Sequence, residues 1–153
     1  MIFGVSRIYR RAAKVLLVNQ HRRVLLFRGI DRTRPTIAPW WFAVGGAVEA
    51  GEEPAAAAIR ELYEETGLRI SDPGPVIMTR RFDWEFEGCA YDQEESYFLV
   101  RTTEFTPETA GWSETERATM RGHHWWSIED LRATNETIYP NGLAGLLENF
   151  LAD

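Results

Sequence analysis

Several features that mark specialised classes of protein are scarce or missing in this sequence. The single cysteine, Cys89, excludes an internal disulfide, so folding needs no oxidising compartment and we expect a cytoplasmic protein. No run of about 18 apolar residues could cross a membrane, and Arg7, Arg10 and Arg11 interrupt the start where a signal peptide would be apolar. Because repeats, low-complexity tracts and linkers are also missing, we expect residues 1–153 to form one domain.

Positive charge is scarce relative to negative charge. The chain has 17 Lys and Arg against 23 Asp and Glu, a formal net charge of −6, which argues against DNA binding through charge alone. The acidic excess is local, because residues 49–65 contain six glutamates and one basic residue, Arg60. Arginines do cluster around the first predicted loop, and Arg28 is our candidate substrate contact among them, although surface arginines are ordinary in a chain with one lysine, Lys14.

The remaining composition, 44% hydrophobic and 26% charged, is that of a globular protein. Runs of β-branched, leucine and aromatic residues predict strands at 14–18, 23–27, 41–44, 75–87, 97–101 and 123–126, with loops at 29–39, 88–92 and 106–118. Leu143, Leu147 and Leu151 have the spacing of an amphipathic C-terminal helix. Mixed strands with two or three helices indicate an α/β or α+β sandwich.

The predicted strand 75–87 carries two candidate substrate-binding residues. Its apolar side includes Trp84, which could stack on a nucleobase, a contact worth about 1 to 3 kcal/mol, although a role in the core is the more common one for a tryptophan. Arg80 interrupts that apolar side. It either reaches toward a phosphate or is turned to solvent by a bulge, and the sequence leaves both alternatives open.

A helix is predicted over residues 53–66. Pro54 suits the first turn, alanines follow it, and Gly67 can adopt the left-handed conformation that ends a helix. The helical spacing places the apolar residues on one side and Glu61, Glu64 and Glu65 on the other. We expect Ala57 on the acidic side, where its small size would leave room for a ligand.

Three glutamates this close repel one another, each pair costing roughly 0.2 to 0.5 kcal/mol on an isolated helix. A bound cation would compensate for the repulsion, and hard carboxylate oxygens are the ligands that Mg²⁺ or Mn²⁺ prefers. Gly45, Gly46 and Gly51 precede the helix, so the backbone there can approach a phosphate closely.

Residues 46–68 resemble the Nudix box: Gly46, then Glu52, then the run from Arg60 through Gly67 to Leu68 match all nine defining positions. Val44 departs from the pattern, since many members have proline before the two glycines. The resemblance implies the Nudix fold, an α/β/α sandwich with a mixed β-sheet. It also implies cleavage of the diphosphate bond in a nucleoside diphosphate linked to another group.

The resemblance further implies roles for individual residues. Glu64 and Glu65 would be metal ligands, Glu61 a ligand or the group that positions and deprotonates water, and the Gly45 carbonyl would complete the ligand shell. Arg60 would pair with Glu52 to brace the loop.

An additional base often comes from outside the box in this family. Our first candidate is Glu116, because it lies in the polar connection before Trp125, and weaker candidates are Glu94, Glu95 and Glu108.

The expected protein is therefore a pyrophosphohydrolase that depends on Mg²⁺ or Mn²⁺ and acts on a small nucleotide. Nucleoside triphosphates, including oxidised ones, ADP-ribose and dinucleoside polyphosphates remain open as substrates, as does a homodimer. One alternative is a non-catalytic nucleotide sensor, which would not need every carboxylate of the box. Others are a Nudix-like isomerase and an RNA cap pyrophosphatase, the latter disfavoured by the acidic composition.

Overall fold

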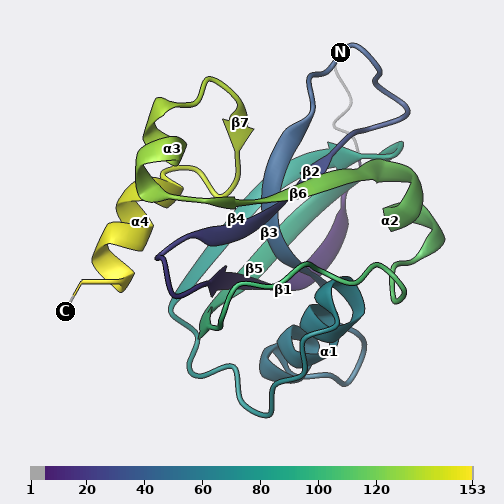
Figure 1. Cartoon of the computed structure of the whole chain (residues 1–153). Helices are drawn as coiled ribbons and strands as arrows, with labels where there is room; N and C mark the ends of the chain where they lie inside the picture. Colours follow the sequence, from purple (N-terminus) through teal and green to yellow (C-terminus); the bar gives the residue numbers. More distant parts are fainter. Residues whose placement is uncertain (1–5, 153) are drawn as a thin grey trace.

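The structure is a computed structural model that describes residues 6–152 (Figure 1). In chain order, the elements are β1 (Ile8–Val18), β2 (Val24–Gly29), β3 (Trp40–Ala47), α1 (Pro54–Thr66), β4 (Met78–Phe86), β5 (Cys89–Arg101), α2 (Glu114–Thr119), β6 (Met120–Trp126), α3 (Ile128–Ala133), β7 (Thr137–Ile138) and α4 (Leu143–Phe150). Among the described residues, no helix is long and apolar enough to cross a membrane.

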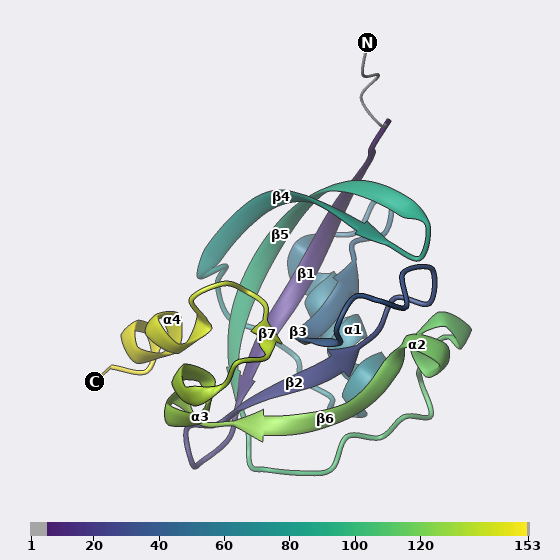
Figure 2. The same ribbon diagram turned by 90° about the horizontal axis from the view of Figure 1, so that it is seen from above.

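The strands form one mixed, strongly curved sheet in the order β4-β5-β1-β2-β3-β7, with β6 paired to β2. The central strand β1 runs parallel to β5 and antiparallel to β2 and β3. Helix α1 lies against one face of the sheet, and α3 and α4 lie on the other side (Figure 2). The predicted α/β/α sandwich with a mixed sheet is confirmed.

Each face of the sheet has its own apolar core. On the α1 side, Leu62 packs with Phe27 and Val44 in one cluster. On the other side, α4 contributes Leu143 and Leu147, which have almost no exposed surface, so the predicted amphipathic helix is confirmed. Because a fully buried Leu or Phe side chain contributes about 1.5–3 kcal/mol, these two cores hold α1 and α4 firmly in place.

Helix α1 closely matches its prediction. Glu53 is its N-cap, Pro54 begins it, and Gly67 ends it with a left-handed φ of 82°. Ala57 is a correction, because its side chain is completely buried in the α1 core and leaves no room for a ligand. The apolar face of α1 is therefore wider than the predicted stripe.

Strand β5 is much longer than predicted, and of the predicted loop 88–92 only Gly88 lies outside a strand. A two-residue turn at Glu87 and Gly88, with φ of 50° and 84°, joins β4 directly to β5. Positive φ at both central residues gives the backbone twist that a tight hairpin needs. The hairpin curls over the sheet beside β1, as the view from above shows (Figure 2).

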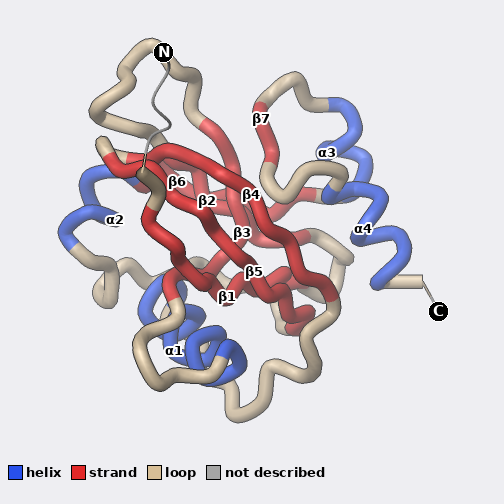
Figure 3. Tube along the Cα trace, turned by 180° about the vertical axis from the view of Figure 1, so that it is seen from behind, coloured by secondary structure: helices blue, strands red, loops and turns tan. Residues whose placement is uncertain are grey.

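The predicted loop 106–118 also ends in helical structure. Helix α2 begins after Ser113, whose hydroxyl accepts a hydrogen bond from the Glu116 backbone N–H, while the Glu116 carboxylate accepts one from the Ser113 N–H. This reciprocal pair is a capping box. The back view shows α2 near α1, at the same end of the sheet (Figure 3).

Candidate active site

A cleft of about 1380 Å³ opens on the sheet and extends to the carboxylates of α1. Its walls come from α1, α2, the β4–β5 hairpin and the segment between β7 and α4. The volume is larger than the ~300–1,000 Å³ typical of small-molecule pockets, so a nucleotide with its phosphates fits inside.

Two glycines let the α1 carboxylates approach the sheet closely. A Cβ atom on Gly45, which has a φ of 136°, would lie 2.1 Å from the Ala13 carbonyl oxygen. A Cβ on Gly46 would lie 2.7 Å from the Glu61 carboxylate. The Gly45 N–H donates to the Glu65 carboxylate at 2.8 Å, so this loop and α1 hold each other in register.

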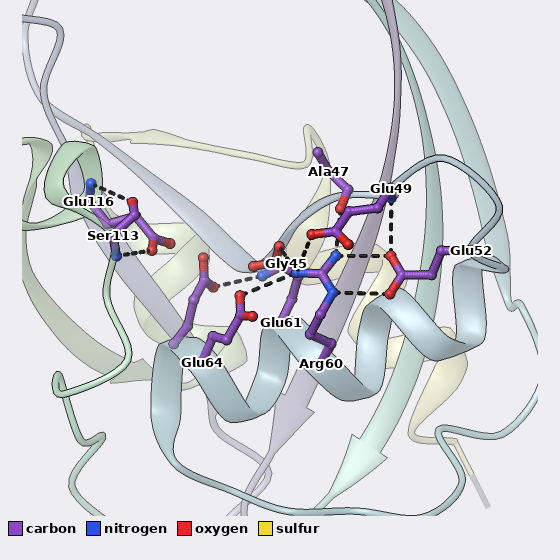
Figure 4. Close-up of polar contacts among 10 residues, drawn as sticks. Gly45, Ala47, Glu49, Glu52, Arg60, Glu61, Glu64, Ser113 and Glu116 are labelled. Atoms are coloured by element: carbon purple, nitrogen blue, oxygen red, sulfur yellow. Dashed lines mark hydrogen bonds and ion pairs between the residues drawn. The ribbon is translucent and has the colours of Figure 1, made fainter.

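Arg60 is the cation that holds this end of the cleft together (Figure 4). Its guanidinium donates to both oxygens of Glu52, at 3.0 and 2.9 Å, and to the Ala47 carbonyl at 2.9 Å. The same side chain donates to Glu61 at 2.9 Å and to Glu64 at 3.2 Å. These bonds lower the pKa of Glu52 and raise the pKa of Arg60. The Arg60–Glu52 pair that the resemblance implied is thus present in the structure.

The structure gathers three carboxylates into one group: Glu61, Glu65 and Glu116 each place an oxygen within 4.8 Å of the others. Glu61 is 9% exposed and Glu65 is 2% exposed. Burial raises the pKa of Glu61. It also raises the pKa of Glu65, where Glu116 adds to the increase and the positive charge of Lys14 opposes it.

These residues fit a divalent cation. Buried carboxylates side by side are unfavourable unless a cation or protons compensate them, and three converging oxygen donors are hard ligands of the kind Mg²⁺ or Mn²⁺ binds. Neither histidine nor cysteine among the described residues joins the group, which argues against a zinc site.

Glu64 lies beside this group rather than within it. Its side chain is 42% exposed and its carboxylate is bonded to Arg60. Of the four proposed bases, Glu116 reaches the group and Glu95 lines the cleft. Glu94 instead accepts a hydrogen bond from Tyr9 on the exposed side of β5, and Glu108 lies against Gly67 at the end of α1.

Two of the three predicted substrate contacts line the cleft. Arg80 lies there without a bulge, because β4 and β5 pair in continuous register, and it donates to the Asn141 carbonyl at 2.7 Å. Trp84 is the other. Arg28 does not line the cleft, and its guanidinium pairs with Glu136 at 3.7 Å.

Sequence reasoning assigned no site role to two residues of the cleft. Lys14 is 9% exposed and lies 5.4 Å from the centre of the Phe42 ring, and Gln93 is almost completely buried. The sequence did contain a signal for Lys14, because a lysine in the apolar run of a predicted strand is unusual. Gln93 gave none, because residues 89–96 lack an apolar alternation that would predict a strand.

Comparisons with known proteins place this geometry in context. Residues 8–148 match the family described as NUDIX domain. A protein of Francisella tularensis subsp. mediasiatica named RNA pyrophosphohydrolase is 42% identical over 96 residues, which are 63% of this chain and 53% of that protein. The chain thus spans about half the length of these curated relatives.

Solved structures share the fold at low identity. The MutT protein from Methanosarcina mazei matches with a TM-score of 0.67 at 20% identity, covering 96% of each chain. The Escherichia coli dihydroneopterin triphosphate pyrophosphohydrolase matches with a TM-score of 0.62 at 21% identity, covering 94% of this chain and 97% of that one.

Proposed function

Because residues 8–148 match its family, the chain belongs to the NUDIX domain family, and we propose that it is a metal-dependent pyrophosphohydrolase. It hydrolyses the diphosphate bond of a nucleoside diphosphate linked to another group. The products are a nucleoside monophosphate and pyrophosphate or a phosphorylated remainder.

The observation that carries this proposal is the convergence of Glu61, Glu65 and Glu116 at one end of a cleft large enough for a nucleotide. These three side chains would hold Mg²⁺ or Mn²⁺, with Glu64 beside them and the Gly45 carbonyl as a further ligand. When bound, the cation neutralises phosphate oxygens and acidifies water, the chemistry that phosphoryl transfer requires.

The protein side chains do the positioning. Arg60 fixes Glu61 and Glu64 through one guanidinium, so that neither carboxylate is free to turn away from the cleft. Glu61 or Glu116 accepts the proton of the attacking water.

Lys14, deeper in the cleft, would bind the substrate phosphates. Lys14 lies on β1, with Gly45 opposite it on β3 and Tyr97 opposite it on β5. The Lys14 ammonium is therefore close to the group of three carboxylates, although Lys14 itself is on a strand of the sheet. Arg80 lines the same cleft from β4.

A second candidate substrate is the 5′ polyphosphate end of an RNA. The observation that favours it is the 42% identity over 96 residues to a protein named RNA pyrophosphohydrolase. The net charge of −6 favours the small nucleotide instead, because a long RNA would be repelled by the protein as a whole.

One experiment separates these candidates. The purified protein is incubated with Mg²⁺ or Mn²⁺ and a panel of nucleoside triphosphates, ADP-ribose, a dinucleoside polyphosphate and a 5′-triphosphorylated RNA, and the products are identified. We expect a nucleoside monophosphate from at least one small nucleotide. Tight nucleotide binding with no product from any substrate would contradict the proposal and favour a sensor.

We place the protein in the reducing cytoplasm because Cys89 is a free thiol, and we leave a homodimer as an option to be tested by light scattering.

A further inference from the structure

The wall of the cleft formed by β4 and β5 contains a chain of hydrogen bonds that the proposed hydrolysis does not use. The indole N–H of Trp84 donates to the Gln93 side-chain oxygen at 2.9 Å. The Gln93 amide N–H donates to one Glu95 oxygen at 2.7 Å, and the Tyr97 hydroxyl donates to the other at 2.6 Å. All four side chains line the cleft.

Glu95 is an unusual group to find in this position. It is 5% exposed, and among residues 6–152 its bonds come from two neutral donors and no ion pair. Each carboxylate oxygen can accept two hydrogen bonds, so each Glu95 oxygen keeps one free lone pair. Arg80 lies opposite Glu95 on β4, but its guanidinium bonds to the Asn141 carbonyl and forms no ion pair with Glu95. A buried carboxylate with unused acceptors and no ion pair is costly, unless something else in the cleft donates to it.

The chain of bonds also fixes the direction of these acceptors. Because the Trp84 indole can only donate, the Gln93 oxygen must face it and the Gln93 amide nitrogen must face Glu95. Tyr97 holds the second oxygen, so the carboxylate cannot rotate freely. Glu95 therefore presents two fixed, adjacent acceptors beside the aromatic wall of Trp84 and Phe86, whose rings stack at 5.4 Å.

From this arrangement, we propose that Glu95 reads the base of the substrate by accepting two parallel N–H bonds from a 2-amino-lactam edge, as in guanine or a pterin. This inference rests on the proposed function and specifies its substrate class. A ring N–H beside an exocyclic amine supplies two adjacent donors that match a carboxylate. Adenine and cytosine each set an amine beside a ring nitrogen that is an acceptor, and uracil sets its one N–H between two carbonyls.

The position of Glu95 in the sheet suits this role. Glu95 lies two residues before Tyr97 on β5. Tyr97 is opposite Lys14 on β1, and Lys14 is opposite Gly45 on β3, so Lys14 lies between Tyr97 and Gly45. Neighbouring strands are about 4.8 Å apart, so Gly45 and Tyr97 are separated by about 10 Å. A nucleotide with its base at Glu95 would thus pass its phosphates over Lys14 toward the α1 carboxylates.

The test compares nucleotides that differ at this edge. Hydrolysis of GTP, ITP and ATP is measured with Mg²⁺, and neopterin triphosphate is included to tell a pterin from a guanine preference. Hypoxanthine in ITP keeps the ring N–H but lacks the amine. We expect kcat/KM for GTP or the pterin to exceed that for ITP by about 10- to 100-fold, the discrimination of one good bidentate pair.

The variant Glu95→Gln removes one of the two acceptors with little change in shape. In this variant, we expect kcat/KM for GTP to exceed that for ITP by no more than about threefold, because one half of the bidentate pair is lost. The matched control is Glu94→Gln, the neighbour that bonds to Tyr9 on the exposed side, and it should keep the wild-type ratio. If Glu95→Gln fails to fold, the wild-type comparison alone still decides.

Binding without hydrolysis separates this inference from the proposed function. GDP, IDP and ADP are titrated by calorimetry in the absence of divalent metal. Tighter binding of GDP supports base reading even if no nucleotide is hydrolysed. Equal affinities, or a GTP preference that survives in Glu95→Gln, would overturn the inference, while hydrolysis of all three nucleotides at equal rates would leave the proposed function intact.

Discussion

At the α1 end of the cleft, three carboxylates share one spot, whereas on β5 the single carboxylate of Glu95 is held by two neutral donors. The first arrangement repels itself and calls for a mobile cation. The second lies outside that group of carboxylates, makes no ion pair among the described residues and keeps free acceptors that suit N–H donors. Two carboxylate sites in one cleft thus suit different ligands, because ligand preference follows from the groups around each carboxylate.

The two ends also differ in what supports them. Arg60 alone bonds Glu52, Glu61 and Glu64, so a single cation organises the α1 end. On the β4–β5 wall, Arg80 lies opposite Glu95 but bonds to the Asn141 carbonyl instead. The wall depends on the hairpin staying in register, and the turn of that hairpin is anchored by a different buried carboxylate, Asp31.

The largest effect is expected from removing one charge at the α1 end. Glu64→Gln should lower the rate of hydrolysis by more than about 100-fold, since even the residues that support metal ligands cost 10–100-fold when changed. Stability should change little because the Glu64 side chain is 42% exposed. The measurements are product release with Mg²⁺ and with Mn²⁺, and urea unfolding.

The matched control for that variant is Glu53→Gln, an exposed glutamate at the start of the same helix whose side chain makes no capping bond. It should keep the wild-type rate. A wild-type rate in Glu64→Gln would mean that Glu61, Glu65 and Glu116 form the complete ligand set and that the family-derived role of Glu64 is wrong here.

The same contrast explains what sequence could and could not predict. The α1 end is encoded in residues 46–68, and its helix limits follow from Pro54 and Gly67. The β4–β5 wall depends on strand register, which pairs Arg80 with Glu95 and Trp84 with Tyr91, and no local pattern specifies that pairing. The polar first half of β5 is a strand because β1 and β4 pair with it on both sides, so tertiary structure overrode weak local propensity.

Other features that were not predicted did have a signal in the local sequence. Helix α2 is only six residues long, but Ser113 and Glu116 have the spacing of a capping box. We chose Glu116 for its place in the polar connection. The capping box explains why helix α2 holds it in a fixed position beside the other two carboxylates. The prediction for Arg28 rested on its position next to a loop, and that position says nothing about the side of the strand on which its guanidinium lies.

The β4–β5 wall is supported at its turn by Asp31. The Asp31 carboxylate accepts bonds from Thr33, from the Arg34 side chain and from the Glu87 N–H at the hairpin turn. Burial by itself would raise its pKa, but these bonds outweigh it and lower the pKa to about 2. Asp31→Asn should therefore reduce the free energy of unfolding at pH 7 by about 1–2 kcal/mol.

The stabilisation by Asp31 should depend on pH. The pKa of Asp31 in the fold lies below its unfolded value of 3.8, so the ionised group stabilises the protein above pH 3.8 and loses that effect as the pH falls toward about 2. Urea unfolding from pH 7 down to pH 2.5 should show wild type and variant converging. The exposed Asp72→Asn is the control, and a gap that stayed constant with pH would rule out this account.

The smallest effect is expected from Lys14, which lies between the two ends. If the nucleotide spans the cleft, Lys14→Met should raise KM about tenfold with a smaller change in kcat. A tenfold change is at the low end of the range expected when a hydrogen bond to a charged group is lost. Lys14→Arg should recover part of that loss, and Arg23→Met, an exposed cation on the β1–β2 hairpin, should leave KM unchanged.

Because Lys14 is the only lysine, its contact with phosphate can be read without any hydrolysis. Reductive methylation with ¹³C-formaldehyde gives one lysine signal besides that of the terminal amine, and inorganic pyrophosphate should shift it. An unshifted signal together with a wild-type KM in Lys14→Met would mean that the phosphates take another route. That result would remove the short path across β1 from Glu95 to the α1 carboxylates, and with it the argument that one nucleotide spans both ends of the cleft.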